Sequence, residues 1–455
     1  MKTLLYGMPS EDFAEIRFGD KRLNNRLKKT VDTMTQSNGE SILGMCGTKH
    51  DAKAFYALLS NKKFSSAEVI RSAQRATVER VKNSGVSTVL LPQDTTGINL
   101  DGHKKTEGLG YSSNHTKGIQ THSCIALTTN GVSLGLVTQQ YHTREQAKSS
   151  ISKSERKKRP IEEKESYRWL ETARESVKLM PEGVRAIVLC DREGDIYEMF
   201  AEMLTLETPF VVRASHNRVT ADKYNCLCKI RQAKACGEVE ISIPRDTRKN
   251  KPARTAKMEV AYCNVKIMRP TGVNEELPNR LTFDIVRITE MGESEHPIEW
   301  FLATNIPISN ADDVMTVVGY YVERWKIERF HYILKSGCQA EKIQQRTYER
   351  ILPVLYIYSV IAVFILSMTY CARFYPDTPC SAFLAEDEWK ILHRLVTRNA
   401  PLPSKPISIA RAVDYLGELG SYKHSHSDGH YGVKSIWKGL FKLFHAIDIA
   451  QRLMG

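Results

Sequence analysis

The spacing of apolar residues changes several times along the chain and predicts a mixed α/β protein. Up to about residue 65, apolar residues recur every three to four positions, which is typical of helices. From 66 to 215, helical stretches alternate with short apolar runs, and Asn130-Gly131 lies between two such runs as in a hairpin. Residues 216–309 alternate with a period of two and predict an all-β insertion. The order of elements predicts a mixed sheet with helices packed on it.

The stretch from Met315 to Lys335 has the spacing of one continuous helix. At about 100° per residue, four polar side chains then share a narrow stripe that is roughly 21 Å long. They are Tyr321, Arg324, Glu328 and Lys335. This stripe could bind phosphates, but the common alternative is a solvated face with an Arg–Glu pair four residues apart.

The run from Ile351 to Met368 carries no charged residue. It is just long enough to cross a membrane, but a fully buried helix of a large domain has the same composition. Pro353 suits the first turn of such a helix. Because nothing else in the chain is membrane-like, we expect a core helix and no membrane partner.

The overall charge is basic, with 65 Lys plus Arg against 52 Asp plus Glu in 455 residues and a pI near 9.1. The excess favours a polyanionic partner such as DNA. A hydrophobic fraction of 42% excludes a largely disordered chain. Ten cysteines without CxxC spacing indicate reduced thiols rather than a disulfide framework. The first 20 residues have too short an apolar segment for a signal peptide, so we expect a cytoplasmic protein.

The first predicted helix carries a basic face. Arg22, Arg26 and Lys29 share this face, Asp20 could cap the helix, and Asn38-Gly39 could end it. In a protein with this charge, such a face could contact phosphates or be a plain soluble surface. Arg22 and Arg26 are therefore candidate DNA-binding residues.

Three polar segments are predicted to be loops. Residues 148–164 and 245–257 are rich in Lys and Arg, so they could contact phosphates or be solvated turns. Residues 422–430 contain His424, His426 and His430. A flexible surface loop is favoured there over a metal site, because no cysteine or acid stands at ligand spacing.

Three acidic residues are candidates for a metal site. Asp94 and Asp191 each follow an apolar run and are predicted at the carboxyl end of a strand, where ligand sites of such sheets lie. If Glu328 meets them, the three could bind divalent cations, and two such ions about 4 Å apart can support phosphodiester cleavage. Taken singly, each aspartate could be only a turn or cap residue. The basic neighbours Arg192 and Arg324 favour the site.

Three sequence blocks resemble bacterial cut-and-paste DDE transposases of the insertion-sequence-four family, transposon-five type. They are DTT at 94–96, CDREGDI at 190–196, and Tyr321-x2-Arg324-x3-Glu328-x6-Lys335. The resemblance extends over nearly the whole chain, including the N-terminal GDKR and C-terminal WKGL segments. It implies a ribonuclease H-like catalytic domain at 66–372, with the β insertion at about 216–309. An N-terminal helical DNA-end-binding domain (1–65) and a C-terminal helical dimerisation domain (373–455) would flank it.

The resemblance also implies a role for each matched residue. Asp94, Asp191 and Glu328 would hold two Mg²⁺ ions, with Mn²⁺ as a substitute. Tyr321, Arg324 and Lys335 would hold phosphates of the transposon end, and Arg213 and Arg26 would contact DNA. Trp300 would stack on a base that is flipped out during hairpin formation.

Four positions depart from the family pattern, namely Gln36, Ser37, Val239 and Tyr332. They lie where the end sequence would be read, so we expect a different terminal repeat with the catalytic residues intact.

The function expected from these features is cut-and-paste transposition of an insertion sequence: end nicking, hairpin formation and opening, and strand transfer. The partners would be double-stranded DNA, as terminal inverted repeats and target, and a second copy of the chain in a homodimeric synaptic complex. The location would be the bacterial cytoplasm, associated with the nucleoid. The alternatives are a DNA-binding regulator or inactive relic without cleavage, and a structure-specific metal-dependent nuclease.

Overall fold

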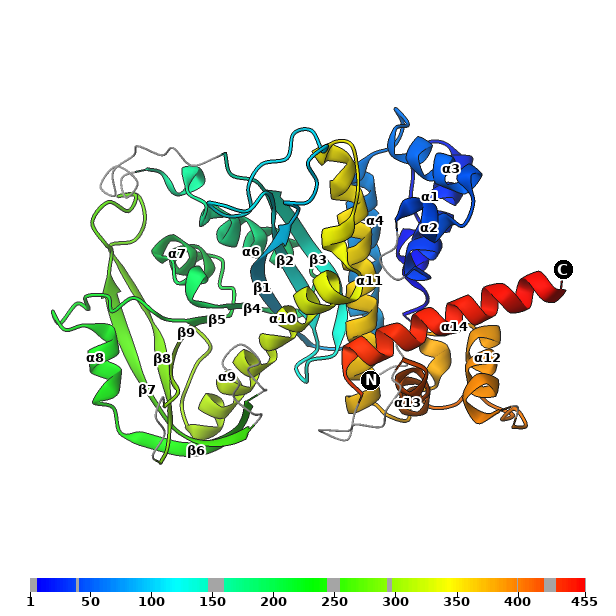
Figure 1. Cartoon of the computed structure of the whole chain (residues 1–455). Coiled ribbons are helices and arrows are strands. Elements are labelled where there is room, and N and C mark those ends of the chain that lie inside the picture. Colours follow the sequence, from blue (N-terminus) through cyan, green and yellow to red (C-terminus); the bar gives the residue numbers. More distant parts are fainter. Residues whose placement is uncertain are drawn as a thin grey trace.

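A computed structural model (Figure 1) describes most of the chain. The described residues are 6–37, 41–145, 159–243, 254–292, 297–398, 400–420 and 431–454. Outside them lie Asn38-Gly39, the His-rich segment up to residue 430, and most of the two predicted basic loops.

One mixed sheet of nine strands organises the described part of the chain, in the order β3-β2-β1-β4-β5-β9-β8-β7-β6. Its first strands are β1 (Thr88–Asn99), β2 (Gly118–Leu127), β3 (Ser133–His142), β4 (Arg185–Cys190) and β5 (Phe210–Arg213). β1 and β2 pair antiparallel, as do β2 and β3, whereas β1, β4 and β5 run parallel. The prediction of a mixed α/β sheet is confirmed, including the hairpin at Asn130-Gly131.

The predicted β insertion extends this same sheet. Its strands are β6 (Ala235–Ile243), β7 (Arg254–Met268), β8 (Arg280–Glu290) and β9 (Glu299–Thr304). β9 pairs antiparallel with β5, so the four strands continue the sheet beyond its parallel centre. The expectation of an all-β segment was wrong in one detail, because the helix α8 (Cys226–Arg231) precedes β6 and packs on β7.

Helices gather at the β3 end of the sheet and on its neighbours (Figure 1). α4 (Ser66–Ser84) and α11 (Tyr348–Phe374) both pack on β3, while α6 (Tyr167–Leu179) packs on β1, β2 and β3. α7 (Tyr197–Thr205) follows β4 and packs on α6.

α11 is the apolar run that could have been a membrane span. It is the only described helix long and apolar enough to cross a membrane, and 94% of that apolar window is buried in the protein. It therefore serves as a core helix, as expected. The helix begins at Tyr348, however, so Pro353 lies inside it and not in its first turn, where it was expected.

The N-terminal helices are α1 (Lys21–Thr35), α2 (Ile42–Cys46) and α3 (Lys49–Leu59). Asp20 caps α1 as predicted, because its side chain accepts a hydrogen bond from the backbone N–H of Arg22. The C-terminal helices are α12 (Glu386–Thr397), α13 (Ile409–Gly420) and α14 (Val433–Met454). In Figure 1 α14 runs from the lower end of α11 toward the side where α1–α3 lie.

Contacts join the N-terminal segment to both other predicted domains. The ring of Tyr6 stacks on that of Phe383, with centroids 4.4 Å apart. Asp12 forms a buried bidentate ion pair with Arg80 of α4, with oxygen–nitrogen distances of 2.5 and 2.8 Å. These contacts hold the first helices against the body that carries the sheet.

Candidate active site

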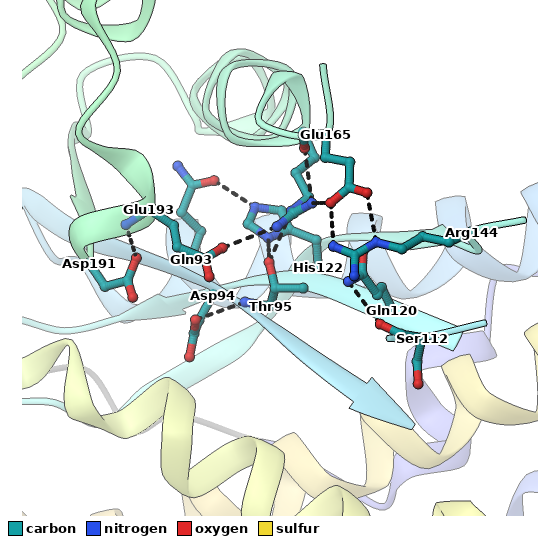
Figure 2. Close-up of polar contacts among 11 residues, drawn as sticks. Gln93, Asp94, Thr95, Ser112, Gln120, His122, Arg144, Glu165, Asp191 and Glu193 are labelled. Carbon is teal, nitrogen blue, oxygen red and sulfur yellow. Dashed lines mark hydrogen bonds and ion pairs between the residues drawn. The ribbon is translucent and has the colours of Figure 1, made fainter. Parts of the chain in front are cut away.

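Asp94 and Asp191 lie on neighbouring parallel strands at matching heights. The last paired residues of β1 and β4 are Pro92 and Leu189, and each aspartate stands two residues beyond its own strand's member of that pair. Because paired strands lie about 4.8 Å apart, this register makes the two aspartates neighbours. Figure 2 shows both side chains where β4 ends beside β1.

The expectation that Asp94 ends its strand was wrong, since β1 continues to Asn99. The antiparallel partner β2 goes on pairing with β1 after β4 has ended, with Asp94 opposite Ser123. Asp191 does follow the end of β4, as predicted, and its Oδ1 accepts a hydrogen bond from the backbone N–H of Glu193 at 2.8 Å. That bond caps the short 3-10 helix Arg192–Gly194.

The predicted continuous helix from Met315 to Lys335 is divided. α9 (Ala311–Glu323) and α10 (Trp325–Tyr332) meet at Arg324, and a π-helical turn, Ile333–Gly337, follows. The turn is closed by the backbone N–H of Cys338, which donates to the carbonyl of Ile333 at 2.8 Å. A π turn has more residues per turn than an α-helix, so the single-helix stripe does not extend regularly to Lys335.

Lys335 nevertheless reaches the strand that carries Asp94. Its Nζ donates to the carbonyl of Gly97 at 2.9 Å and lies 3.3 Å from the Oγ1 of Thr96. The ammonium is thus anchored two to three residues beyond Asp94 along β1.

The three predicted acids share one electrostatic environment. Burial raises the pKa of Asp94 to about 7, the charge of Arg324 opposes this rise, and the charges of Asp191 and Glu328 add to it. A buried carboxylate whose pKa is raised in part by neighbouring carboxylates favours a cation beside it.

Glu328 is paired with Arg324 in this structure, with Oε1 2.6 Å from the guanidinium nitrogen Nη2. Accordingly, no three His, Cys, Asp or Glu side chains within the described residues are already gathered as a metal cluster. The donor set still suits Mg²⁺, since Asp94, Asp191 and Glu328 offer only carboxylate oxygens. A metal would have to compete with Arg324 for Glu328.

His331 was not identified from the sequence. Its Nδ1 lies 3.8 Å from the Oδ2 of Asp94. Burial lowers the pKa of His331 to about 3, with Lys335 and Arg324 adding to the effect, so the ring is neutral and the contact is not an ion pair. The spacing of three residues from Glu328 along α10 was the signal that could have revealed it.

Four of the predicted DNA-contacting residues form one cluster beside the acids. The rings of Trp300 and Tyr321 meet edge-on, with centroids 5.8 Å apart. The guanidinium of Arg213 lies 5.6 Å from the centroid of Trp300, and that of Arg324 lies 5.7 Å from the centroid of Tyr321. The cluster thus brings Arg213 of β5 together with Tyr321 of α9, which are more than 100 positions apart in the sequence.

Arg22 and Arg26 are not part of this cluster. They lie on α1, which Figure 1 shows beyond α4 and α11 from the centre of the sheet. The side chain of Arg26 lies 3.8 Å from Asp51 of α3, and Lys29 lies 3.2 Å from the same carboxylate. Asp51 therefore compensates part of the basic face that the sequence predicted.

Asp195 is a second residue that sequence reasoning missed. Its buried carboxylate accepts hydrogen bonds from the backbone N–H groups of Ser215 and His216 at 2.6 and 2.7 Å, and it pairs with Arg218. These contacts fix the chain just after Arg213. The signal was its place as the second aspartate of the CDREGDI block.

Comparison with known proteins bears on the N-terminal part of the chain. Residues 9–64 match the transposase DNA-binding family. The match contains α1–α3 with Arg22 and Arg26, and it supports a transposase whose N-terminal segment binds DNA.

One solved structure with a likeness to this chain is described as a cryo-EM structure of the piggyBac transposase synaptic complex with hairpin DNA. The likeness covers 98% of this chain and 73% of that one, at 11% sequence identity and a TM-score of 0.35. A TM-score this low carries no argument about fold or activity.

Proposed function

We propose that this protein is a DDE transposase of the insertion-sequence-four type, which cuts and joins DNA ends by metal-dependent phosphoryl transfer. The observation that carries the proposal is the register of Asp94 and Asp191, two residues beyond the last pair of β1 and β4, with Glu328 close enough to raise the pKa of Asp94. The transposase DNA-binding match at residues 9–64 supports the same function independently. The proposed catalytic domain is ribonuclease H-like.

In this proposal Asp94, Asp191 and Glu328 hold two Mg²⁺ ions, for which Mn²⁺ can substitute. Bound divalent ions supply activation of the attacking oxygen and stabilisation of the departing one. The carboxylates of this chain would hold the ions in position, while the basic residues would bind the phosphates on either side of the scissile bond. The same site serves nicking, hairpin formation, hairpin opening and strand transfer in turn.

Arg324 is suited to hold a phosphate because its contact with Glu328 uses only part of the guanidinium. Its buried Nε has no hydrogen-bond partner among the described residues. A guanidinium carries five N–H donors, so it can bind a phosphate while it still faces a carboxylate. Tyr321 packs against Arg324, and the side chain of Lys335 reaches β1. These two residues would hold neighbouring phosphates of the same DNA strand.

Trp300 is proposed to stack on a base that leaves the duplex when the hairpin forms. The indole is half-buried, and the ring of Tyr321 and the guanidinium of Arg213 hold it in place. Such stacking stabilises an extruded base by about 1–3 kcal/mol. Arg213 would bind the phosphate of the same nucleotide.

The N-terminal and C-terminal helices would bind the DNA ends and assemble the complex. We assign terminal-repeat binding to the N-terminal helices through Arg22 and Arg26, and dimerisation in the synaptic complex to the C-terminal helices α12–α14. The reaction would take place in the bacterial cytoplasm, at the nucleoid.

Cleavage of the element's own ends tests the proposal. Purified full-length protein in Mg²⁺ should nick DNA that carries the inverted repeats flanking its gene, and Asp191→Ala should abolish nicking while it leaves the gel shift in EDTA intact. Asp377→Ala, an exposed acid elsewhere in the chain, is the matched control and should cut normally. Cutting by Asp191→Ala would overturn the proposed triad.

The same experiment separates the alternatives. Binding of the ends without cleavage by the wild-type protein would favour a DNA-binding regulator or an inactive relic. Cleavage that does not require the inverted repeats, and that joins no 3′ ends to target DNA, would favour a structure-specific nuclease.

A further inference from the structure

We propose that Arg168 is a positioning residue that holds the Asp94 and Asp191 segments in register for metal binding. The inference rests on the proposed function. Arg168 lies in the first turn of α6, and its side chain is only 8% exposed. It belongs to none of the sequence blocks that resemble transposases.

The guanidinium of Arg168 bridges the chain segments that follow the two aspartates. Its Nε–H donates to the Oγ1 of Thr95 at 3.1 Å, and its Nη2 donates to the Oε2 of Glu193 at 3.1 Å. Thr95 is the residue after Asp94, and Glu193 lies two residues after Asp191. A third bond, from Nη1 to the carbonyl of Glu165 at 2.9 Å, ties the guanidinium to the start of α6.

Thr95 continues the connection into the sheet (Figure 2). Its hydroxyl lies 2.8 Å from the Nδ1 of His122 on β2, and the Nε2 of His122 lies 3.0 Å from the Oε1 of Gln93. Burial and the charge of Arg168 lower the pKa of His122 well below its usual value, so the ring is neutral. Since Gln93 Oε1 can only accept, Nε2 carries the proton and Nδ1 accepts from Thr95.

Gln93 makes a further link between β1 and β4, through the residues that precede the two aspartates. Its Nε2 donates to the Sγ of Cys190 at 3.3 Å. Gln93 directly precedes Asp94, and Cys190 directly precedes Asp191. The two aspartates are therefore flanked on both sides by side-chain bonds that link β1 to the end of β4 and the turn after it, and the ion pair of that network is formed by Arg168 and Glu193.

The arrangement matters because the two aspartates lie beyond the last backbone pair of β1 and β4. Side chains must keep the strands together at that height, since the parallel hydrogen-bond ladder no longer does. Residues that orient metal ligands through hydrogen bonds typically change metal affinity or activity by about 10–100-fold when they are removed. A buried arginine with a merely structural role would change the stability of the protein and leave its metal affinity unchanged.

The test compares Mn²⁺ binding with thermal unfolding in full-length protein. Arg168→Gln removes the bridge, and Thr95→Val breaks it without changing charge or size. Arg174→Gln is the matched control on α6, because Arg174 pairs with Glu202 at the surface. Mn²⁺ binding is followed by electron paramagnetic resonance without DNA, with Asp191→Ala as the blank. Unfolding is followed in EDTA.

We expect Arg168→Gln and Thr95→Val to weaken Asp191-dependent Mn²⁺ binding about tenfold or more, with Arg174→Gln within twofold of wild type. If both folded variants bind Mn²⁺ like the wild type, the inference is overturned, whatever their melting temperatures. If Arg168→Gln does not fold, Thr95→Val alone decides in the same way. If the wild-type protein shows no Asp191-dependent Mn²⁺ binding, the metal site of the proposed function fails, and the role of Arg168 fails with it.

Discussion

The guanidinium of Arg324 lies 2.6 Å from the carboxylate of Glu328, one turn further along the chain. Arg324 is also the main charge that opposes the rise in the pKa of Asp94. One buried cation therefore compensates two of the three proposed metal ligands in the protein without DNA. When a phosphate binds Arg324, Glu328 loses part of that compensation, which favours its binding to a metal.

Arg324→Gln should weaken DNA binding by the loss of one phosphate contact. Each phosphate contact adds about 0.9 to the slope of log K against log salt, so the slope should fall by roughly one. The slope is measured by fluorescence anisotropy on a labelled end duplex in EDTA at several salt concentrations. Arg329→Gln, a cation of α10 whose guanidinium lies over the ring of Tyr332, is the matched control. An unchanged slope for Arg324→Gln would argue against the phosphate contact.

Trp300→Ala should slow hairpin formation and leave the first nick nearly unchanged. The indole is assigned to an extruded base, which exists only after nicking, and stacking is worth about 1–3 kcal/mol. Trp300→Phe should recover part of the rate because an aromatic face remains. Single-turnover reactions on intact and pre-nicked ends separate the two steps. Equal loss of nicking and hairpin formation would point instead to a packing role beside Tyr321.

Asp94→Asn should stabilise the metal-free protein at pH 8. The folded-state pKa of Asp94 is about 7, against roughly 3.9 in an unfolded chain, so ionisation costs stability as the pH rises between these values. The asparagine stays neutral, so the gain should be up to about 4 kcal/mol at pH 8, at about 1.36 kcal/mol per pKa unit, and should nearly vanish near pH 4. Urea unfolding in EDTA at both pH values measures it, with Asp377→Asn as the control. Equal stability of Asp94→Asn and wild type at pH 8 would contradict the raised pKa that burial gives Asp94.

Leu355→Ala should destabilise the protein by about 2–5 kcal/mol, because it opens a cavity in a fully buried helix. Leu395→Ala, at an exposed leucine of α12, should change stability by less than about 0.5 kcal/mol. Chemical denaturation of both variants in detergent-free buffer makes the comparison. Similar small effects for the two leucines would mean that α11 is not packed as a core helix.

Much of the fold could be predicted from local patterns. The switch from a helical period to a period of two marks residues 216–309, and Asn130-Gly131 marks the hairpin of β2 and β3, because both depend on neighbours in sequence. The pairing of β9 with β5, which makes the insertion part of the main sheet, depends on residues about 90 positions apart and left no local trace. The helical period of the apolar residues could not show that α9 and α10 are divided at Arg324, or that a π turn surrounds Lys335. The spacing of apolar residues is nearly the same across the division and across the π turn.

For the site, the sequence determined which residues could do chemistry: two aspartates that follow apolar strands, and a helix with a phenol, a guanidinium, a carboxylate and an ammonium at fixed offsets. Only the tertiary structure decided how they meet. The parallel register of β1 and β4 places Asp94 beside Asp191. The pair of Arg324 with Glu328 was foreseen from their spacing, but only the structure shows that Arg324 is buried beside the aspartates and not on a solvated face. The bridge made by Arg168 was also invisible in the sequence. Arg168 is separated from its partners by up to 73 residues, and hydrogen bonds between such distant positions are set by packing rather than by local pattern.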